Sequence, residues 1–96
     1  MPPSPWVRID NRLIHGQVIE AWLPYIGASV LVVANDEVAS DGIQQEIMSL
    51  AIPQTATALF VHVERVQAAL VQAMAAGPQA ALILFASCSD ARRALE

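Results

Sequence analysis

The sequence has no lysine, a single cysteine and only 5% aromatic residues among its 96 positions. Its five arginines are dispersed and its net charge is −4. A nucleic-acid-binding surface is therefore not expected, because neutralising phosphates requires clustered cations. The lone Cys88 cannot form an intramolecular disulfide, and no Cys/His set has the spacing of zinc ligands. We expect a cytosolic protein that uses no metal and no other cofactor.

Several common catalytic and targeting motifs are also missing. There is no Walker lysine, no G-x-G-x-x-G, no H-E-x-x-H and no G-x-S-x-G, which disfavours a nucleotide kinase. The first five residues lack the basic and apolar regions of a signal peptide. Residues 66–89 carry no charge, but Gly77 and Pro78 would break a membrane-spanning helix at its middle. We predict a helix, a turn and a buried strand there.

The residues that are present predict a folded α/β domain. Composition is 55% apolar and 15% charged, which is incompatible with a disordered tail. The length suits one domain spanning residues 1–96, which would bury about two-thirds of the surface of its extended chain.

Hydrophobic periodicity predicts strands and helices in alternation. Strands are expected at residues 6–9, 29–34, 57–63 and 80–86, and helices at 16–23, 38–51, 65–76 and from 91. In the second helix we expect Ile43, Ile47 and Leu50 to be buried, with Met48 at one side. Ser89 or Asp90 is expected to cap the last helix.

This alternation predicts an α/β fold with a mostly parallel open sheet, four βα units, right-handed crossovers and helices on both faces. The carboxyl ends of parallel strands point to one edge of a sheet, and ligands bind there. Polar residues that follow the strands should therefore share one rim. They are Asp10 to His15, Asp36, His62 and Ser87 to Ser89.

The loop from Arg8 to Gln17 is the most polar of these connections, with two arginines, a carboxylate, an amide and a histidine. The free N–H groups at a helix start attract anions, and arginines add a forked cationic clamp. His15 lies at such a start, beside Gly16, which lets a bulky anion approach the backbone. A neutral imidazole nitrogen can attack phosphorus. His15 is therefore a candidate phosphoryl acceptor.

The neighbours of His15 are candidates for supporting roles. Asp10 can hold the proton on the other ring nitrogen of His15 and fix its tautomer. Arg8 and Arg12 are either solvated cations or groups that offset the charge of a phosphoryl dianion. Arg12 is the better candidate, because Arg8 can instead pair with Asp36 or Asp10.

The other rim residues leave alternatives open. Asp36 is either a helix cap or turn former, or a group that positions the loop. Ser87 and Ser89 are candidate hydroxyl donors to phosphate, with helix capping as the alternative for Ser89. We interpret His62 as a structural residue and Cys88 as a plain loop thiol.

The segment from Arg8 to Val18 closely resembles a known active-site loop. Mannose/sorbose-class IIB components of the bacterial sugar phosphotransferase system read R-I-D-D-R-L-I-H-G-Q-V there, and Asn11 stands where Asp is usual. Residues 36–41 and, more loosely, 51–53 match the same family. In that family the loop histidine carries the phosphoryl group.

The resemblance implies a role in sugar uptake. His15 would accept a phosphoryl group from a IIA-domain histidine and pass it to a sugar bound by membrane components of the IIC/IID type. The protein would be a cytoplasmic transferase associated peripherally with the inner-membrane complex. Its loop would be shaped by Arg8, Asp10, Asn11 and Arg12, and the helix behind it would be opened by Gly16 and Gln17.

Members of that family continue for more strands and helices, and their later strands extend the sheet beyond the first strand. If those strands are absent here, the first strand becomes an exposed edge, and we expect self-association to cover it. Two other functions stay open. One is a non-catalytic anion-binding or regulatory module that self-associates, and the other is an unrelated small oxidoreductase or response-type domain in which the loop is incidental.

Overall fold

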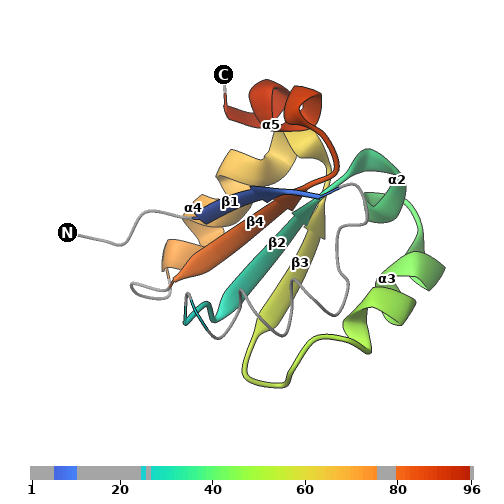
Figure 1. The fold of residues 1–96 in the computed structure, drawn as a ribbon, viewed down its shortest axis with the longest axis vertical. Helices are drawn as coiled ribbons and strands as arrows, with labels where there is room; N and C mark the ends of the chain where they lie inside the picture. Colours follow the sequence, from blue (N-terminus) through green and yellow to red (C-terminus); the bar gives the residue numbers. More distant parts are fainter. Residues whose placement is uncertain (1–5, 11–24, 26, 76–79, 96) are drawn as a thin grey trace.

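A single parallel sheet forms the centre of the protein (Figure 1). The computed structural model describes residues 6–10, 25, 27–75 and 80–95. The helix predicted at 16–23 and the turn at Gly77 and Pro78 lie outside these residues. The described elements are β1 (Trp6–Ile9), β2 (Val30–Ala34), α2 (Asp36–Ala39), α3 (Gly42–Ser49), β3 (Thr57–Val61), the 3-10 helix η2 (Val63–Arg65), α4 (Val66–Ala75), β4 (Ala81–Phe85) and α5 (Cys88–Leu95).

The strand order is β1-β4-β2-β3, and every pairing is parallel. In register, Ile9 and Ala34 both lie opposite Phe85, and Ala34 also lies opposite Val61. All strands therefore end at the same edge of the sheet. The predicted α/β fold with a parallel sheet is confirmed.

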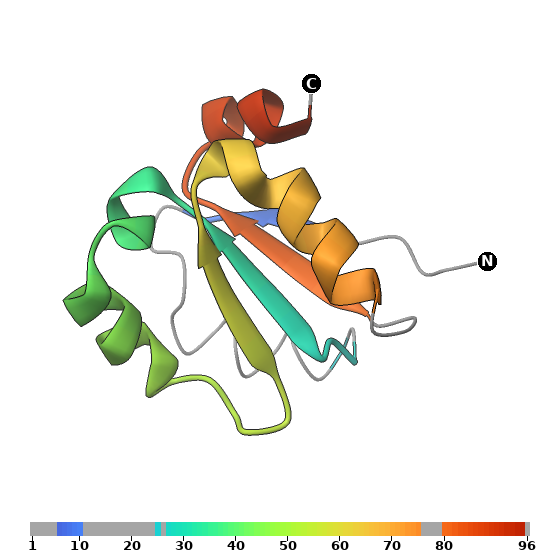
Figure 2. The same cartoon turned by 180° about the vertical axis from the view of Figure 1, so that it is seen from behind.

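The two central strands form the core. Every residue of β2 and β4 is buried. Continuous apolar runs of this kind are typical of strands covered on both faces. One face packs against Val38 of α2 and Met48 of α3, and the other packs against Val66 of α4 and Ala91 of α5. Figure 2 shows α4 lying across the second face. The prediction of helices on both faces is confirmed.

The single helix predicted at 38–51 is wrong. The chain forms α2, a turn at Ser40 and then α3. The turn follows from a second capping residue, because both backbone N–H groups of Ile43 and Gln44 donate to Asp41 Oδ1, at 3.1 and 3.2 Å. The Gln44 side-chain amide also donates to Asp41 Oδ2, at 2.9 Å. Asp41 therefore accepts hydrogen bonds from the first turn through both carboxylate oxygens and starts a new helix.

The predicted burial in this region is also wrong. Ile43, Ile47 and Leu50 are 71%, 63% and 88% exposed, whereas Met48 packs against the core. The restart at Asp41 gives α3 its own direction, and α3 extends beyond β3 at the side of the sheet (Figure 1). Its inward side is therefore the one that carries Met48.

The cap of α5 differs from the prediction as well. The helix begins at Cys88, and Ser87 Oγ accepts the N–H of Asp90 at 3.1 Å. Ser87 is therefore the capping residue, and Ser89 and Asp90 lie in the first turn. A serine three residues before an acidic residue is a capping signal in the sequence.

Among the described residues, β1 pairs with β4 alone. Trp6, Val7 and Ile9 are 48%, 43% and 42% exposed, so apolar side chains are accessible on both faces of this edge. The expectation of an exposed first strand is confirmed within the described chain. None of the described helices is long and apolar enough to span a bilayer.

The central strands set the stability of the fold. Leu84 is fully buried, so Leu84→Ala should lower the free energy of unfolding by about 2–5 kcal/mol through lost burial and a residual cavity. The matched substitution Val71→Ala, at a site 70% exposed, should cost less than about 0.5 kcal/mol. Urea denaturation followed by circular dichroism measures both. Equal effects of the two substitutions would contradict this core assignment.

Candidate functional site

The residues that follow the strands meet at the carboxyl edge of the sheet. The N–H of Asp10 donates to the carbonyl of Phe85 at 2.9 Å, and the N–H of Asn35 donates to the carbonyl of Val61 at 3.0 Å. The ends of β1, β4, β2 and β3 are thus bound side by side. The expectation of a shared rim is confirmed for Asp10, Asp36, His62 and Ser87 to Ser89.

Half of the predicted site lies outside the described residues. These residues are His15, Arg12, Asn11, Gly16 and Gln17, and their roles stay predictions. The described site residues are Arg8, Asp10, Asp36, Ser87 and Ser89.

Arg8 and Asp10 place the start of the loop on one face of the sheet. Arg8 lies on β1 in register with Leu84, whose side chain belongs to the cluster under α2. Residues two apart in a strand point to the same face. Arg8 therefore shares the α2 face, and Asp10 follows it at the end of the strand, next to the end of β4.

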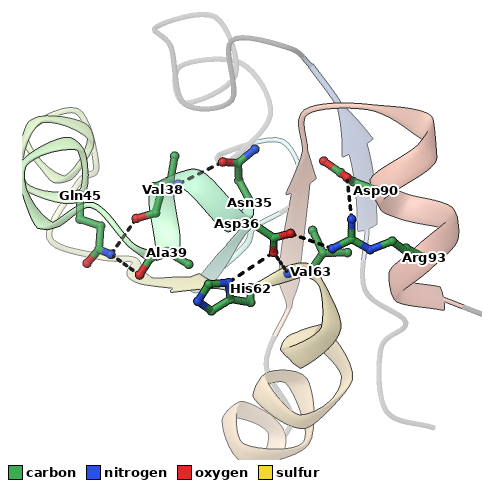
Figure 3. A network of polar contacts seen from close by, with 9 residues as sticks. All are labelled: Asn35, Asp36, Val38, Ala39, Gln45, His62, Val63, Asp90 and Arg93. Carbon is green, nitrogen blue, oxygen red and sulfur yellow. Dashed lines mark hydrogen bonds and ion pairs between the residues drawn. The ribbon is translucent and has the colours of Figure 1, made fainter.

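Asp36 is the centre of a polar network at the rim (Figure 3). Its Oδ2 accepts a hydrogen bond of 2.8 Å from Arg93 Nη2 of α5. Its Oδ1 accepts the N–H of Val63 at 3.0 Å and lies 3.4 Å from His62 Nδ1. The network joins the start of α2 to η2 and α5, three segments that follow three different strands.

The open alternatives for Asp36 are partly resolved by these contacts. The cap of α2 is Asn35, whose Oδ1 accepts the N–H of Val38 at 3.0 Å, and not Asp36. The partner that sequence reasoning missed is Arg93, which also lies 3.8 Å from Asp90. Arg93 is distant from Asp36 in the sequence. The only feature of the sequence that indicated their proximity was the position of Arg93 on the helix that follows β4.

The contacts of Asp36 stabilise its ionised form. The hydrogen bond from Arg93 and, next, that from the Val63 N–H lower the pKa of the Asp36 carboxyl below its usual range. Asp36 and Arg93 are each about half exposed, at 50% and 48% of the side chain, so water screens the pair. The result is an ionised carboxylate that is paired with a cation at the rim.

The start of α5 lies beside the end of β1, because β4 and β1 are adjacent. Ser87 uses its hydroxyl oxygen as the helix cap, while Ser89 lies in the first turn of the helix. Their roles toward phosphate stay predictions. Cys88 is exposed at the first position of α5.

The Asp36 network predicts a dependence of stability on pH. Because the pKa of Asp36 is lower in the folded state, the folded protein binds fewer protons. The stabilisation is present above the ordinary carboxyl pKa of about 3.9 and is lost as the pH falls through the folded value. We expect the free energy of unfolding to fall less steeply below about pH 4 in Asp36→Asn than in the parent protein.

Urea denaturation between neutral and acidic pH measures this difference. If Arg93 is the main cause, Arg93→Gln should reproduce most of the effect, and Asp36→Asn should add little in that background. A full additional effect of Asp36→Asn in the Arg93→Gln protein would contradict the assignment.

The chain matches a family model over residues 5–96, and that model is described as "PTS system sorbose subfamily IIB component". It is 42% identical over 66 residues to the N-acetylgalactosamine-specific phosphotransferase enzyme IIB component 2 of Escherichia coli (strain K12). That match covers 69% of this chain and 42% of the relative. The mannose-specific EIIAB component of the same organism is 34% identical over 89 residues, which cover 93% of this chain and 27% of the relative.

Solved structures agree with these sequence matches. An N-acetyl-galactosamine IIB component from Streptococcus pyogenes aligns with a TM-score of 0.86 and 31% identity, over 99% of this chain and 57% of that one. The IIBSor domain of the sorbose permease from Klebsiella pneumoniae gives a TM-score of 0.79 and 25% identity, over 98% and 60%. This chain thus spans less than two-thirds of the length of these relatives. It belongs to the sorbose subfamily of phosphotransferase-system IIB components.

Proposed function

We propose that this protein is a phosphocarrier in sugar uptake, with His15 as the transient carrier. A ring nitrogen of neutral His15 attacks the phosphorus of a phosphohistidine on a IIA-type donor domain. The new P–N bond forms as the donor P–N bond breaks, and the donor imidazole leaves and takes up a proton. A sugar hydroxyl then attacks the phosphorus, the bond to His15 breaks, and the hydroxyl proton passes to the released imidazole.

One observation carries the proposal. In a chain of the IIB family, the segment Arg8 to Val18 matches the family's active-site loop, and it begins on β1 at the carboxyl edge of the sheet. Ligands of parallel α/β sheets bind at that edge. The histidine of the motif follows Asp10 by five positions in the sequence, and we infer that it acts at this rim.

The charges around the rim suit a phosphoryl group. Phosphoryl transfer depends mainly on positioning and on offsetting negative charge. Arg8 and Arg12 would supply positive charge within the motif, and Asp10 would orient the imidazole. The carboxylate of Asp36 would repel a phosphoryl dianion, but its hydrogen bond to Arg93 compensates that charge. Asn11, Gly16, Gln17, Ser87 and Ser89 complete the proposed phosphate surroundings.

The partners follow from the same proposal. The name of the mannose-specific EIIAB relative joins a IIA and a IIB component, which supports a IIA-type donor for His15. The acceptor is a sugar held by membrane components of the IIC/IID type. The protein would act in the cytoplasm, peripherally bound to the inner-membrane complex. The family match does not favour the alternative of a non-catalytic anion-binding module, or that of an unrelated domain with an incidental loop.

The assignment of His15 is tested by phosphorylation in solution. Incubation with phosphoenolpyruvate, the two general relay proteins and a cognate IIA domain should add one acid-labile phosphate, detected by mass spectrometry. The addition should be absent in His15→Gln. The matched control is His62→Gln, because the chain has only two histidines.

Phosphate that persists in His15→Gln, or that disappears in His62→Gln, would place the carrier elsewhere. A folded parent protein that accepts no phosphate would contradict the carrier function and support the binding module. Circular dichroism on each variant separates loss of the acceptor from loss of the fold.

The exposed edge of β1 supports self-association as a further part of the proposal. Edge strands with accessible apolar side chains readily pair with another strand, and β1 of a second copy can pair across a twofold axis. Trp6, Val7 and Ile9 would be covered in such a dimer.

Analytical ultracentrifugation tests this pairing. The parent protein should form a dimer whose fraction rises with concentration, and Val7→Lys should shift it to a monomer because a charge on an edge opposes pairing. Val71→Lys, at an exposed site on α4, serves as the control and should leave the dimer intact. A monomer at high concentration in the parent protein would rule out the pairing.

A further inference from the structure

The outer side of α3 carries an apolar stripe that the described chain leaves uncovered. Ile43, Ile47 and Leu50 are 71%, 63% and 88% exposed. Residues spaced by four and then three positions lie on one side of a helix. Sequence periodicity marks these residues as a buried face, yet they face solvent.

The stripe continues into a groove beside the sheet. An open groove of about 740 Å³ lies between α3 and β3, lined by Ile47 and Leu50 on one side and by Phe60 on the other. Among the described residues β3 pairs only with β2, so the groove lies at an edge of the sheet. Its lining is mainly apolar.

The orientation of α3 is fixed by contacts on its inner side. The Gln45 amide donates to the carbonyls of Val38 and Ala39, at 2.8 and 3.3 Å, and so satisfies the end of α2 (Figure 3). Asp41 caps the start of α3, and Met48 packs on the core. The exposed stripe therefore belongs to a helix that is held in place on its other side.

The charges around the stripe have one sign. Glu37, Asp41 and Glu46 lie on α2, on α3 or between them. The sequence has no arginine between Arg12 and Arg65 and no lysine at all. Two copies meeting through this surface would oppose acidic residues, and an anionic lipid surface would repel it. A partner that combines apolar side chains with lysines and arginines is complementary.

We propose that the outer side of α3 and its groove, the α3 surface, dock a basic, apolar-centred cytoplasmic segment of the membrane component that receives the phosphoryl group. This inference rests on the proposed phosphocarrier function. Cytoplasmic loops of membrane proteins are rich in lysine and arginine, which matches the acidic flank of the α3 surface. The first residue of α2, Asp36, lies at the rim, so docking here brings the carboxyl edge of the sheet close to the membrane component.

The geometry also separates the two ends of the sheet. The α3 surface adjoins β3. The motif from Arg8 to Gln17 instead begins on β1, at the opposite end of the strand order. A partner bound to α3 therefore leaves the β1 end accessible to the donor domain. One surface can hold the protein at the membrane while the rim exchanges phosphate.

The test compares binding of the full chain to proteoliposomes that contain the membrane component and to protein-free liposomes of the same lipids. Ile47→Gln and Leu50→Gln should each weaken binding to the proteoliposomes by about tenfold or more, as expected for apolar anchors of an interface. Glu46→Lys should also weaken binding to the proteoliposomes, and the loss should be larger at low salt than at high salt. Val71→Gln and Glu64→Lys are the matched controls, and both should bind as the parent protein does.

Other outcomes overturn the inference. The inference is wrong if the parent protein and Ile47→Gln bind the proteoliposomes equally, or if the parent protein does not bind them. It is also wrong if the parent protein binds the protein-free liposomes equally well. A dimer in ultracentrifugation that Ile47→Gln disrupts would show that a second copy covers this surface instead.

A second measurement, phosphorylation by the IIA domain in solution, distinguishes a failure of this inference from a failure of the proposed function. Ile47→Gln and Leu50→Gln should accept phosphate on His15 as the parent protein does, but should transfer it to sugar more slowly in the proteoliposomes. Loss of phosphorylation in the parent protein would contradict the carrier function itself. Normal phosphorylation with unchanged binding of the variants would contradict only the docking surface.

Discussion

The structure depends on the burial of two adjacent parallel strands, β2 and β4, on both of their faces. All their residues are inaccessible to solvent, so the segments on either side must supply the helices that cover them. A parallel sheet also gives every strand the same direction, which collects the connections after the strands at one edge. The same constraint that makes the core therefore brings Asp10, Asp36 and Ser87 together.

The strands and the rim were predictable from the sequence, but the contacts across the rim were not. Apolar runs identify β2 and β4 because burial on both faces removes polar residues from them. Asp36 and Arg93 come from distant segments, and no local pattern links them. The break between α2 and α3 had a local signal, Asp41 followed by Gln44, but apolar spacing across it favoured one continuous helix. The loop residues from Asn11 to Gln17 lie outside the described structure, and their placement stays a prediction.

The Asp36 network bears on the phosphate site proposed at this rim. A carboxylate near a dianion is unfavourable unless its charge is compensated, and Arg93 compensates it directly. The same hydrogen bonds tie α2, η2 and α5 to one point, because Val63 and His62 also contact Asp36. Asp36 thus joins three segments at the rim and is itself paired with a cation, which suits the proposed phosphoryl transfer because that reaction depends on positioning and on charge compensation.

The charge distribution divides the sequence into two parts of different character. The described arginines lie on β1, in η2 and on α5, and Arg12 follows β1 in the sequence, while the stretch that forms α2 and α3 is acidic. A phosphocarrier must meet a donor and an acceptor in turn, and one surface that bound both would make them compete. An acidic, apolar side and a rim edged by arginines can bind partners of opposite character without such competition. The exposure of Ile47 and Leu50 fits the proposed docking surface, because such a surface must remain apolar while it is unoccupied.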